Sequence, residues 1–382
     1  MGPMVTRDDV LSTLRGVRDP ELGGNIVELG MVTDVSVVDG LVDVGIALTI
    51  AECPLRNQIE DDARRRVESM PGVDGAQIRT TGMTKRQRAG LMSVARAQAR
   101  AGAEPTQVAP TTRVIAVGSG KGGVGKSSIS VNLAVAMAES GLRVGLLDAD
   151  IWGFSTPRML GVEDRLEADN ETKLIVPVVA QGVKLVSTGL IIETEETALM
   201  WRGLMLSKAL EQFLKQVEWG ELDYLIIDLP PGTGDIQMAL TRMLPQAEMV
   251  VVTTPQRAAQ KVAVRVADMA RRSHMPIIGV IENMAGLACD CGRVHEVFGR
   301  GGGGELAEDL GVPLIASIPL DPEVVPGGDH GAPVVTTATA SPAGAALREA
   351  AETMVRLLPP ADLETCTGRI AKILTELEEL PA

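Results

Sequence analysis

A glycine cluster between a strand pattern and a helix pattern is the strongest chemical signal in this sequence. The stretch VIAVGSGKGGVGKSSISVNLA, residues 114–134, passes from β-branched residues through glycines into alanine-rich residues. Consecutive glycines let backbone N–H groups surround phosphates, and the N-terminus of the following helix adds partial positive charge. Lys126 would neutralise the β- and γ-phosphates of a nucleotide, and the Ser127 hydroxyl would bind Mg²⁺. The predicted nucleotide-binding residues of this loop are Gly120, Lys121, Gly122, Gly123, Val124, Gly125, Lys126, Ser127 and Ser128.

Acidic residues at two later strand ends complete the parts of a nucleotide hydrolase. Asp148 and Asp150 stand at the end of LLDAD, and Asp228 ends the apolar run YLIID. Doubly wound sheets collect their ligands at the carboxyl ends of parallel strands. Asp228 fits a carboxylate that holds Mg²⁺ through water, followed by a glycine-rich switch up to Asp235. A single aspartate after a strand is commonly a helix cap, but two in order after such a loop favour nucleotide hydrolysis.

Two of the four cysteines, Cys289 and Cys291, are separated by a single residue, and this pairing indicates metal chemistry. The alternative interpretation is a pair of half-exposed structural cysteines. Cys53 precedes Pro54 at a predicted helix N-terminus, which either lowers the pKa of the thiol or leaves a buried structural residue. Cys366 near the C-terminus offers no functional argument.

Strand and helix patterns alternate from residue 113 onward, and these elements must position the chemical side chains. Near-continuous apolar runs of this length are typical of strands covered on both faces. We therefore predict an α/β domain with a doubly wound, mostly parallel sheet. The predicted strands are RVIAVGS, RVGLLDAD, GVKLVST, YLIIDLP, MVVVTTP, PIIGVIENM and PLIASIPL.

The patterns divide the chain into four parts. Residues 1–83 contain a helix, a hairpin, a second helix and a closing strand, so a small α+β domain is expected. Residues 84–112 carry a basic helix and then a flexible linker rich in Pro, Ala and Thr. Residues 113–358 hold the doubly wound domain, and residues 359–382 are predicted to form a C-terminal helical tail.

Length and charge exclude several classes of function. The 382 residues are enough for two or three units with sizeable cores. With 36 basic and 50 acidic side chains, the formal net charge of -14 opposes binding to a phosphate backbone, so nucleic acid is not an expected partner. No apolar run approaches the roughly 20 residues that cross a bilayer, and the first residues lack the apolar core of a signal peptide. A cytoplasmic location without stable membrane association is expected.

The unaltered phrase KGGVGKS at residues 121–127 resembles the deviant Walker A ATPases, the group of MinD, ParA, ArsA and the nitrogenase iron protein. The resemblance implies a P-loop NTPase fold, ATP and Mg²⁺ as ligands, and ATP hydrolysis by a nucleotide-sandwich homodimer. In that family the extra lysine, here Lys121, reaches the phosphates bound by the other subunit. Asp150 matches the aspartate that orients the attacking water. Asn283 matches the position that recognises adenine, with a turn residue as the alternative.

Within that group, LDADIWGFSTPRMLG, DYLIIDLPPGTGD, TTPQ, IENM and IPLDPEV resemble the Mrp/ApbC iron–sulfur cluster carriers over residues 113–358. RDPEL, NIVELGMV and LTIAECPLRNQIEDDA resemble the SufT/PaaD-type domain that precedes the ATPase in many Mrp proteins, with Cys53 as its characteristic cysteine. The resemblance implies a homodimer that assembles a cluster, expected to be [4Fe–4S], and transfers it to apo-proteins. Relatives use Cys-x-x-Cys near the dimer axis, whereas Cys289 and Cys291 are one residue closer.

Two other functions share the same ATPase core. A MinD/ParA-like ATPase would act as a membrane or partner positioning switch, and GRIAKILTELEEL near the C-terminus has apolar residues at helical spacing. Glu376, Glu378 and Glu379 make this helix a poor ligand for anionic lipid, which favours packing in a core or a dimer. A reductase like the nitrogenase iron protein would instead cycle a bound cluster between redox states. We interpret the sequence as that of a cluster carrier.

Overall fold

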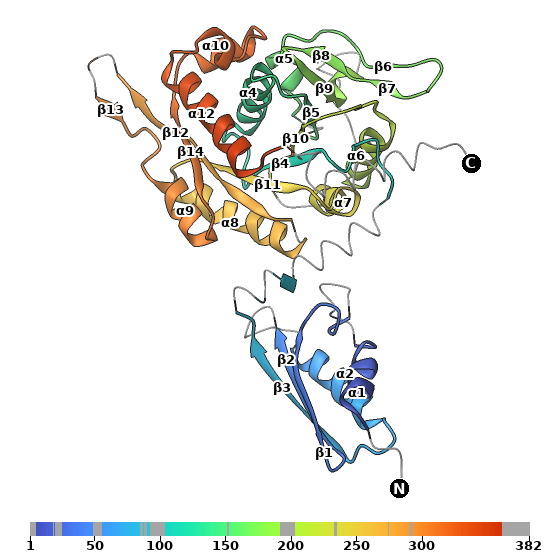
Figure 1. Ribbon diagram of the computed structural model, residues 1–382. Coiled ribbons are helices and arrows are strands. Elements are labelled where there is room, and N and C mark those ends of the chain that lie inside the picture. The colour runs from blue at the N-terminus through green and yellow to red at the C-terminus, as the bar shows by residue number, and fades with distance from the viewer. Residues whose placement is uncertain are drawn as a thin grey trace. The chain divides into compact units, whose positions relative to one another are not determined.

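The computed structural model divides into two compact units, Met1–Gly102 and Ala103–Ala382 (Figure 1). The described residues are 5–360, without 18, 20–24, 49–55, 85–86, 88–89, 92–103, 151–152, 192–202, 233–234, 274, 290 and 292. Cys53, Cys366, most of the predicted basic helix and the C-terminal tail beyond residue 360 therefore lie outside the described residues. The domain boundaries at residues 83, 112 and 358 stay predictions.

In the described part of the N-terminal unit, a three-stranded sheet packs against α1 and α2. The strands are β1 (Val32–Val38), β2 (Leu41–Leu48) and β3 (Gly75–Gly82), and the helices are α1 (Arg7–Leu14) and α2 (Arg56–Glu68). β2 lies in the middle, antiparallel to β1 and parallel to β3. The β1–β2 hairpin turns at Asp39 and Gly40, which both have positive φ. This is the α+β arrangement expected from the sequence.

A nine-stranded sheet is the centre of the described part of the larger unit. Its strand order is β13-β12-β11-β4-β10-β5-β9-β8, and β14 pairs with β12. The pairings are parallel except for β12 with β13 and β8 with β9. The strands are β4 (Arg113–Ser119), β5 (Val144–Asp148), β8 (Val178–Ala180), β9 (Val183–Ser187), β10 (Tyr224–Asp228), β11 (Glu248–Thr253), β12 (Ile277–Ala288), β13 (Val294–His295) and β14 (Leu314–Leu320). A separate two-stranded sheet joins β6 (Glu167–Ala168) and β7 (Ile175–Val176).

Helices cover both faces of the large sheet, as Figure 1 shows, and they bury two hydrophobic clusters. One cluster joins the sheet to α6, α7, α8 and α9, and the other joins it to α4, α11 and α12. The helices are α4 (Lys126–Glu139), α5 (Thr156–Met159), α6 (Gly203–Gln216), α7 (Asp235–Met243), α8 (Arg257–Arg272), α9 (Gly302–Leu310), α10 (Val324–Asp329), α11 (Val334–Thr337) and α12 (Pro342–Leu357), with a 3₁₀ turn at Thr188–Leu190. The expected doubly wound, mostly parallel α/β architecture is confirmed.

Strand β4 illustrates why the sequence shows continuous apolar runs. Val114 and Ala116 pack into the cluster with α6, α7 and α8, whereas Ile115 and Val117 pack into the cluster with α4 and α12. Because successive side chains point to opposite faces and both faces are covered, the four consecutive positions 114–117 are all apolar. None of the helices in the described part of the chain has the length and apolar character needed to span a bilayer.

Candidate functional site

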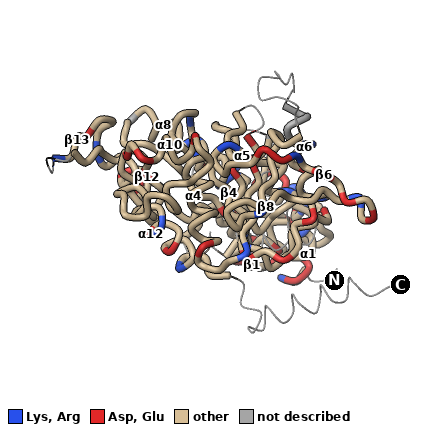
Figure 2. The backbone as a smooth tube through the Cα atoms, turned by 90° about the horizontal axis from the view of Figure 1, so that it is seen from above, with Lys and Arg blue, Asp and Glu red and all other residues tan. Residues whose placement is uncertain are grey.

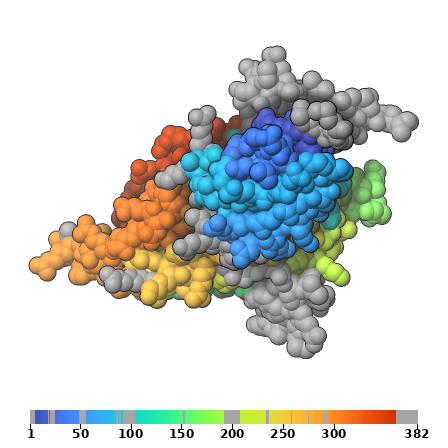
Figure 3. Space-filling model, turned by 90° about the horizontal axis from the view of Figure 1, so that it is seen from below, coloured from blue at the N-terminus to red at the C-terminus, as the bar shows by residue number. Residues whose placement is uncertain are grey.

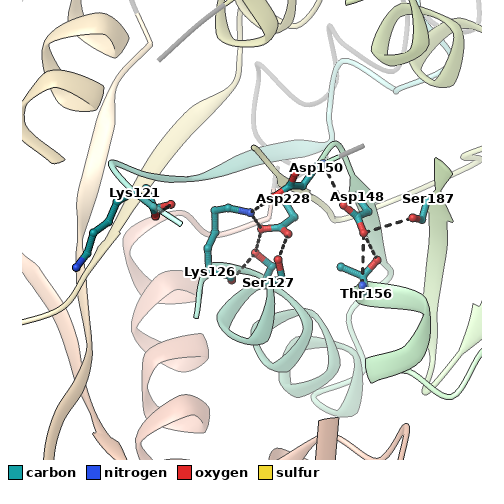
Figure 4. A network of polar contacts seen from close by, with 10 residues as sticks. Lys121, Lys126, Ser127, Asp148, Asp150, Thr156, Ser187 and Asp228 are labelled. Carbon is teal, nitrogen blue, oxygen red and sulfur yellow. Dashed lines mark hydrogen bonds and ion pairs between the residues drawn. The ribbon is translucent and has the colours of Figure 1, made fainter. Parts of the chain in front are cut away.

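The glycine loop (residues 120–125) follows β4, and two aspartates end the strands beside it. β10 lies between β4 and β5, and Asp228 aligns with Val117 of β4 and with Asp148 of β5. Because the three strands are parallel, they all end at one edge of the sheet, where doubly wound folds bind ligands. Figure 4 shows the side chain of Lys126 grouped with Asp228 at this edge.

The shape of the glycine loop depends on glycine for two physical reasons. Gly123 and Gly125 both have a φ of 78°, in the left-handed region that residues with a side chain rarely adopt. Gly120 instead lies against α8, where an added Cβ would come within 2.5 Å of the backbone of Val262. A side chain at any of these three positions would therefore distort the loop that precedes α4.

Asp228 is fully buried, and both of its carboxylate oxygens accept hydrogen bonds from α4. Lys126 Nζ donates to Oδ1 at 2.8 Å, and Ser127 Oγ donates to Oδ2 at 2.5 Å. Ser130 Oγ also donates to Oδ1, at 2.8 Å. The Lys126 side chain is only 6% exposed, so this ion pair is shielded from solvent. The groups predicted to bind phosphate and Mg²⁺ thus meet at one carboxylate.

Ser130 is a member of this network that the sequence interpretation missed. It lies three residues after Ser127 on α4, and residues at that spacing share one face of a helix. The spacing was therefore a usable signal once Ser127 had been assigned to the site.

Asp148 forms a second buried carboxyl group next to Asp228. Its oxygens accept hydrogen bonds from Thr156 Oγ1 at 2.8 Å, from Ser187 Oγ at 3.3 Å and from the Asp150 backbone N–H at 3.0 Å. Burial, together with the negative charge of Asp228, raises the pKa of Asp148 to about 7. This carboxyl group ties the end of β5 to α5 and β9. Thr156 belongs to the phrase LDADIWGFSTPRMLG but was not among the predicted site residues, and no local motif marks Ser187 in β9.

Asp150 lies at the opening of the site and is only partly buried. Its Oδ2 atom is 3.9 Å from Lys126 Nζ, and its side chain is 15% exposed. Burial raises the pKa of Asp150, the positive charge of Lys126 opposes this shift, and the negative charge of Asp228 adds to it. Asp150 borders a pocket with a volume of 260 Å³. The other residues that line this pocket are Ser119, Lys121, Gly122, Gly123, Val124, Gly125, Lys126, Ser127, Ser128, Gly153, Ser155, Met159 and Pro231.

Lys121 lines the same pocket, but its side chain points away from Lys126 and Asp228, as Figure 4 shows. Its Nζ atom donates a hydrogen bond to Gln256 Oε1 at 2.9 Å, and Gln256 is the N-cap residue of α8. Lys121 and Lys126 therefore face different surroundings, since Lys126 contacts the buried Asp228. Gln256 was not among the predicted site residues, although it ends the phrase TTPQ that contributed to the resemblance.

Asn283 in β12 braces the glycine loop. Its Nδ2 atom donates to the carbonyl oxygen of Val124 at 2.9 Å, and a Cβ on Gly125 would lie 2.3 Å from the same Nδ2. The next residue, Met284, has a φ of 59°, which is unusual for a residue with a side chain. The pairing of β12 with β14 also shifts register within residues 283–287. Adenine recognition by Asn283 stays a prediction.

Cys289 and Cys291 lie at the tip of the β12–β13 hairpin, which extends from the sheet in Figure 2 and forms the orange projection in Figure 3. Residues 287–288 pair with residues 294–295, and the Cys289 N–H donates to the Arg293 carbonyl at 2.8 Å, which closes the turn. Both cysteines are exposed. Their Sγ atoms are 3.2 Å apart, which is longer than a disulfide bond of about 2.05 Å.

The structure brings the predicted nucleotide residues together and leaves the cysteine pair at a different place on the sheet. β12 connects the two places, because Asn283 contacts the glycine loop and Cys289 follows six residues later, roughly 20 Å along an extended chain. Over the described ranges, no group of three or more His, Cys, Asp or Glu side chains is arranged to hold a metal ion. The described part of one chain therefore offers two neighbouring thiols but not enough ligands to complete a metal site.

Comparison with known proteins adds two family matches. Residues 110–355 match the family described as NUBPL iron-transfer P-loop NTPase, and residues 7–79 match the family described as iron-sulfur cluster assembly protein. The first match falls in the larger compact unit and the second in the N-terminal unit.

Individual relatives agree with these matches. An iron-sulfur cluster carrier protein of Mycobacterium leprae (strain TN) is 45% identical over 352 residues, covering 90% of this chain and 91% of the relative. A protein of the same name from Synechocystis sp. is 40% identical over 349 residues, covering 90% and 95%. A solved nucleotide-binding protein from Archaeoglobus fulgidus, in complex with ADP, is 37% identical with a TM-score of 0.50, covering 57% of this chain and 86% of that chain.

Proposed function

The chain belongs to the NUBPL family of iron-transfer P-loop NTPases, and from this membership we propose that it is an ATP-hydrolysing carrier of iron–sulfur clusters. In this proposal two copies of the chain assemble a cluster between them and transfer it to apo-proteins. The observation that carries the proposal is the exposed pair of thiols, 3.2 Å apart, in the same compact unit as the nucleotide site. The resemblance to Mrp/ApbC carriers with a small N-terminal domain agrees with both family matches.

The Asp228 network supports binding of ATP together with Mg²⁺ as substrate. When ATP binds, the Lys126 side chain would leave Asp228 and donate to phosphate oxygens, and the Ser127 hydroxyl would leave Asp228 and bind Mg²⁺. Asp228 would then accept a hydrogen bond from water bound to Mg²⁺. Ser130 can keep its bond to the carboxylate during this exchange, so Asp228 retains a donor from the protein. The contacts of Lys126, Ser127 and Ser130 with Asp228 support this assignment, because they bring the proposed phosphate- and Mg²⁺-binding groups together.

We assign Asp150 to orient the water that attacks the γ-phosphate. Its position 3.9 Å from Lys126, at the partly exposed side of the pocket, supports this role, because water can reach it there. The fully buried Asp148 is less suited to the same task, since its oxygens accept hydrogen bonds from Thr156 and Ser187.

We assign Lys121 to the nucleotide bound by the second chain. Lys121 donates to Gln256, whereas Lys126 donates to Asp228 in the same chain, and this difference supports the assignment. In a dimer with facing nucleotides, Lys121 would leave Gln256 and stabilise the charge that develops on the partner's γ-phosphate. Hydrolysis would then depend on dimer formation, whereas nucleotide binding would not.

The cysteine pair requires a second chain for the cargo. An iron–sulfur cluster generally takes four protein thiolates, and each chain offers two at the hairpin tip. A two-fold axis near the hairpins would supply the other two. Because both cysteines are exposed, an acceptor protein could approach the cluster directly. The expectation of a [4Fe–4S] cluster comes from the resemblance and stays a prediction.

The N-terminal unit is proposed to handle the partner or the cluster. Its match to iron-sulfur cluster assembly proteins supports this role, and the nucleotide motifs all lie in the other unit. A role for Cys53 stays a prediction. The positioning-switch alternative shares the same ATPase core, and the C-terminal segment predicted to form a helix lies outside the described residues. No described feature favours that function over the carrier.

A transfer assay tests the proposal. The full chain is reconstituted with iron and sulfide under anaerobic conditions and then incubated with an apo iron–sulfur dehydratase, whose activity returns only with a cluster. We expect activity to return with the wild-type chain and with Cys366→Ser, which serves as the matched control. Cys289→Ala and Cys291→Ala should each abolish transfer while still binding ATP. Failure of the wild-type chain to form a cluster, or a cluster that survives both substitutions, contradicts the proposal.

A further inference from the structure

The geometry of the β12–β13 hairpin points to a site in which Cys289 and Cys291 bind one and the same metal ion. Two thiolates on one tetrahedral ion, each about 2.3 Å from the metal, lie roughly 3.8 Å apart. The two Sγ atoms are 3.2 Å apart, so a small side-chain adjustment brings both into this range. Cys289 and Cys291 are therefore already arranged as a two-point chelate for a thiophilic cation.

The backbone of the hairpin favours this short separation. Only one residue stands between the two cysteines, and the bond from the Cys289 N–H to the Arg293 carbonyl closes the turn that contains them. Strand pairing of residues 287–288 with residues 294–295 holds the base of the turn. In a cubane cluster each iron takes a single protein thiolate, so the two sulfurs of one chain would have to bind two different irons. The two Sγ atoms would then lie farther apart than when both bind one ion.

This chelate predicts the type of cluster, and here the inference rests on the proposed dimeric carrier. Each iron would take both thiolates of one chain, and two bridging sulfides would join the two irons into a [2Fe–2S] cluster. Four thiols release their protons to solvent, and two ferric ions, two sulfides and four thiolates give a complex of charge −2 without electron transfer. The result differs from the [4Fe–4S] cluster that the Cys-x-x-Cys spacing of relatives implies.

The chelate can be tested without iron or sulfide by titrating the full chain with Co²⁺ under anaerobic conditions. In a Cys53→Ser/Cys366→Ser background the hairpin cysteines are the only thiols left. We expect sulfur-to-cobalt charge-transfer absorption that shows both thiolates of a chain on the same ion. Cys289→Ser or Cys291→Ser should each weaken Co²⁺ affinity on the order of 100-fold, because the second point of attachment is lost. If either variant binds Co²⁺ as tightly as the parent chain, the inference is wrong.

Iron analysis separates this inference from the proposed function. Reconstitution of the wild-type chain should give two irons and two sulfides per dimer, and insertion of one glycine after Asp290 should raise the iron count by restoring the longer spacing. Four irons per wild-type dimer would overturn the single-ion chelate and leave the carrier function standing. The chain could instead bind Co²⁺ through both thiolates but form no cluster under conditions that load a known cluster protein. This result would support the chelate and contradict the carrier function.

Discussion

The nucleotide site and the cysteine hairpin differ in how much of each is built by one chain. At the nucleotide site, the buried Asp228 accepts hydrogen bonds from Lys126, Ser127 and Ser130 of the same chain. At the hairpin, Cys289 and Cys291 are exposed and supply only half of a cluster's usual ligands. The polar groups of the first site already contact one another within one chain, whereas the proposed cluster site would need a second chain to complete its ligands.

This difference predicts how substitutions should act. A buried ion pair is costly to break, because removal of one partner leaves the other charged and dehydrated. An exposed hairpin tip contributes little to folding, so substitutions there should change metal binding alone. Substitutions at the nucleotide site should instead alter both stability and ATP turnover. The two regions can thus be separated by measuring stability and function in the same variants.

Lys126→Ala should have the largest effect. The substitution leaves the Asp228 carboxylate buried without its cation, so the free energy of unfolding should fall by about 3–5 kcal/mol. ATP affinity should fall more than about 100-fold, because the charge on the phosphates is removed. Urea unfolding and ATP titration measure the two effects. Lys208→Ala, at an exposed position of α6, is the control and should change neither. Normal ATP binding by Lys126→Ala would show that the site is misassigned.

Lys121→Ala should reduce ATP hydrolysis by about 10³-fold with little change in ATP affinity, since its proposed target is the transition state in the partner chain. Asp150→Ala should also reduce hydrolysis. In a mixed dimer of the two variants, one site regains both groups only if Lys121 acts across the interface. Partial recovery of turnover is therefore expected in steady-state assays of mixed chains. No recovery, despite verified mixed dimers, would place Lys121 in its own site.

Asp148→Asn should change how stability depends on pH. The pKa of Asp148 in the folded chain, about 7, is above its ordinary value of 3.8, so the folded state holds this proton more tightly than the unfolded state. The stability that this protonation gives is present below pH 4 and is lost as pH rises through 7. As pH rises from 4 to 7, the wild type should lose this stability and the variant should not. The difference between their unfolding free energies should therefore change by up to about 4 kcal/mol in favour of the variant. Identical pH profiles of urea unfolding would mean that Asp148 titrates normally.

Asn283→Ala should weaken nucleotide affinity by about tenfold, because the Val124 carbonyl in the glycine loop loses its donor. Since this contact braces the loop and involves no base, ADP and GDP should be affected alike in equilibrium titrations. Weakening confined to ADP would instead support the sequence-based expectation that Asn283 recognises adenine.

Deletion of residues 1–83 should have the smallest effect on the nucleotide site. The predicted phosphate- and Mg²⁺-binding residues all lie in the larger unit, so ATP affinity should be unchanged within about twofold. Calorimetric titration of the truncated chain measures this affinity. A truncated chain that folds, as judged by circular dichroism, but cannot bind ATP would mean that the two units are not independent.

The sequence was most informative where function depends on neighbours along the chain. The glycine loop, Lys126 and Ser127 form one continuous motif, and the apolar runs that end at Asp148 and Asp228 mark buried parallel strands. These features predicted the fold, and they also marked Lys126, Ser127 and Asp228, which the structure brings into contact. The same reasoning identified the cysteine pair, although it gave no information on the separation of the two sulfurs.

The remaining features depend on contacts between distant segments. Gln256 meets Lys121 across 135 positions of sequence, and Ser187 meets Asp148 across 39, so no local pattern records either contact. The edge strand β13 has two residues, which is too short for a periodic pattern to be detected. The hairpin that carries the cysteines therefore became visible only in three dimensions.

Strand β12 has a mechanical consequence, because its residue Asn283 contacts the glycine loop and its last residue, Ala288, directly precedes Cys289. Asn283 contacts the loop, Met284 carries the irregular backbone, and Cys289 follows five residues after Met284, roughly 16 Å away. If the backbone rotates at Met284, beside the glycine loop, this outer segment would carry the cysteines with it. A rotation of about 5° at Met284 would move the sulfurs by about 1.4 Å, which is more than half the length of a metal–thiolate bond of about 2.3 Å.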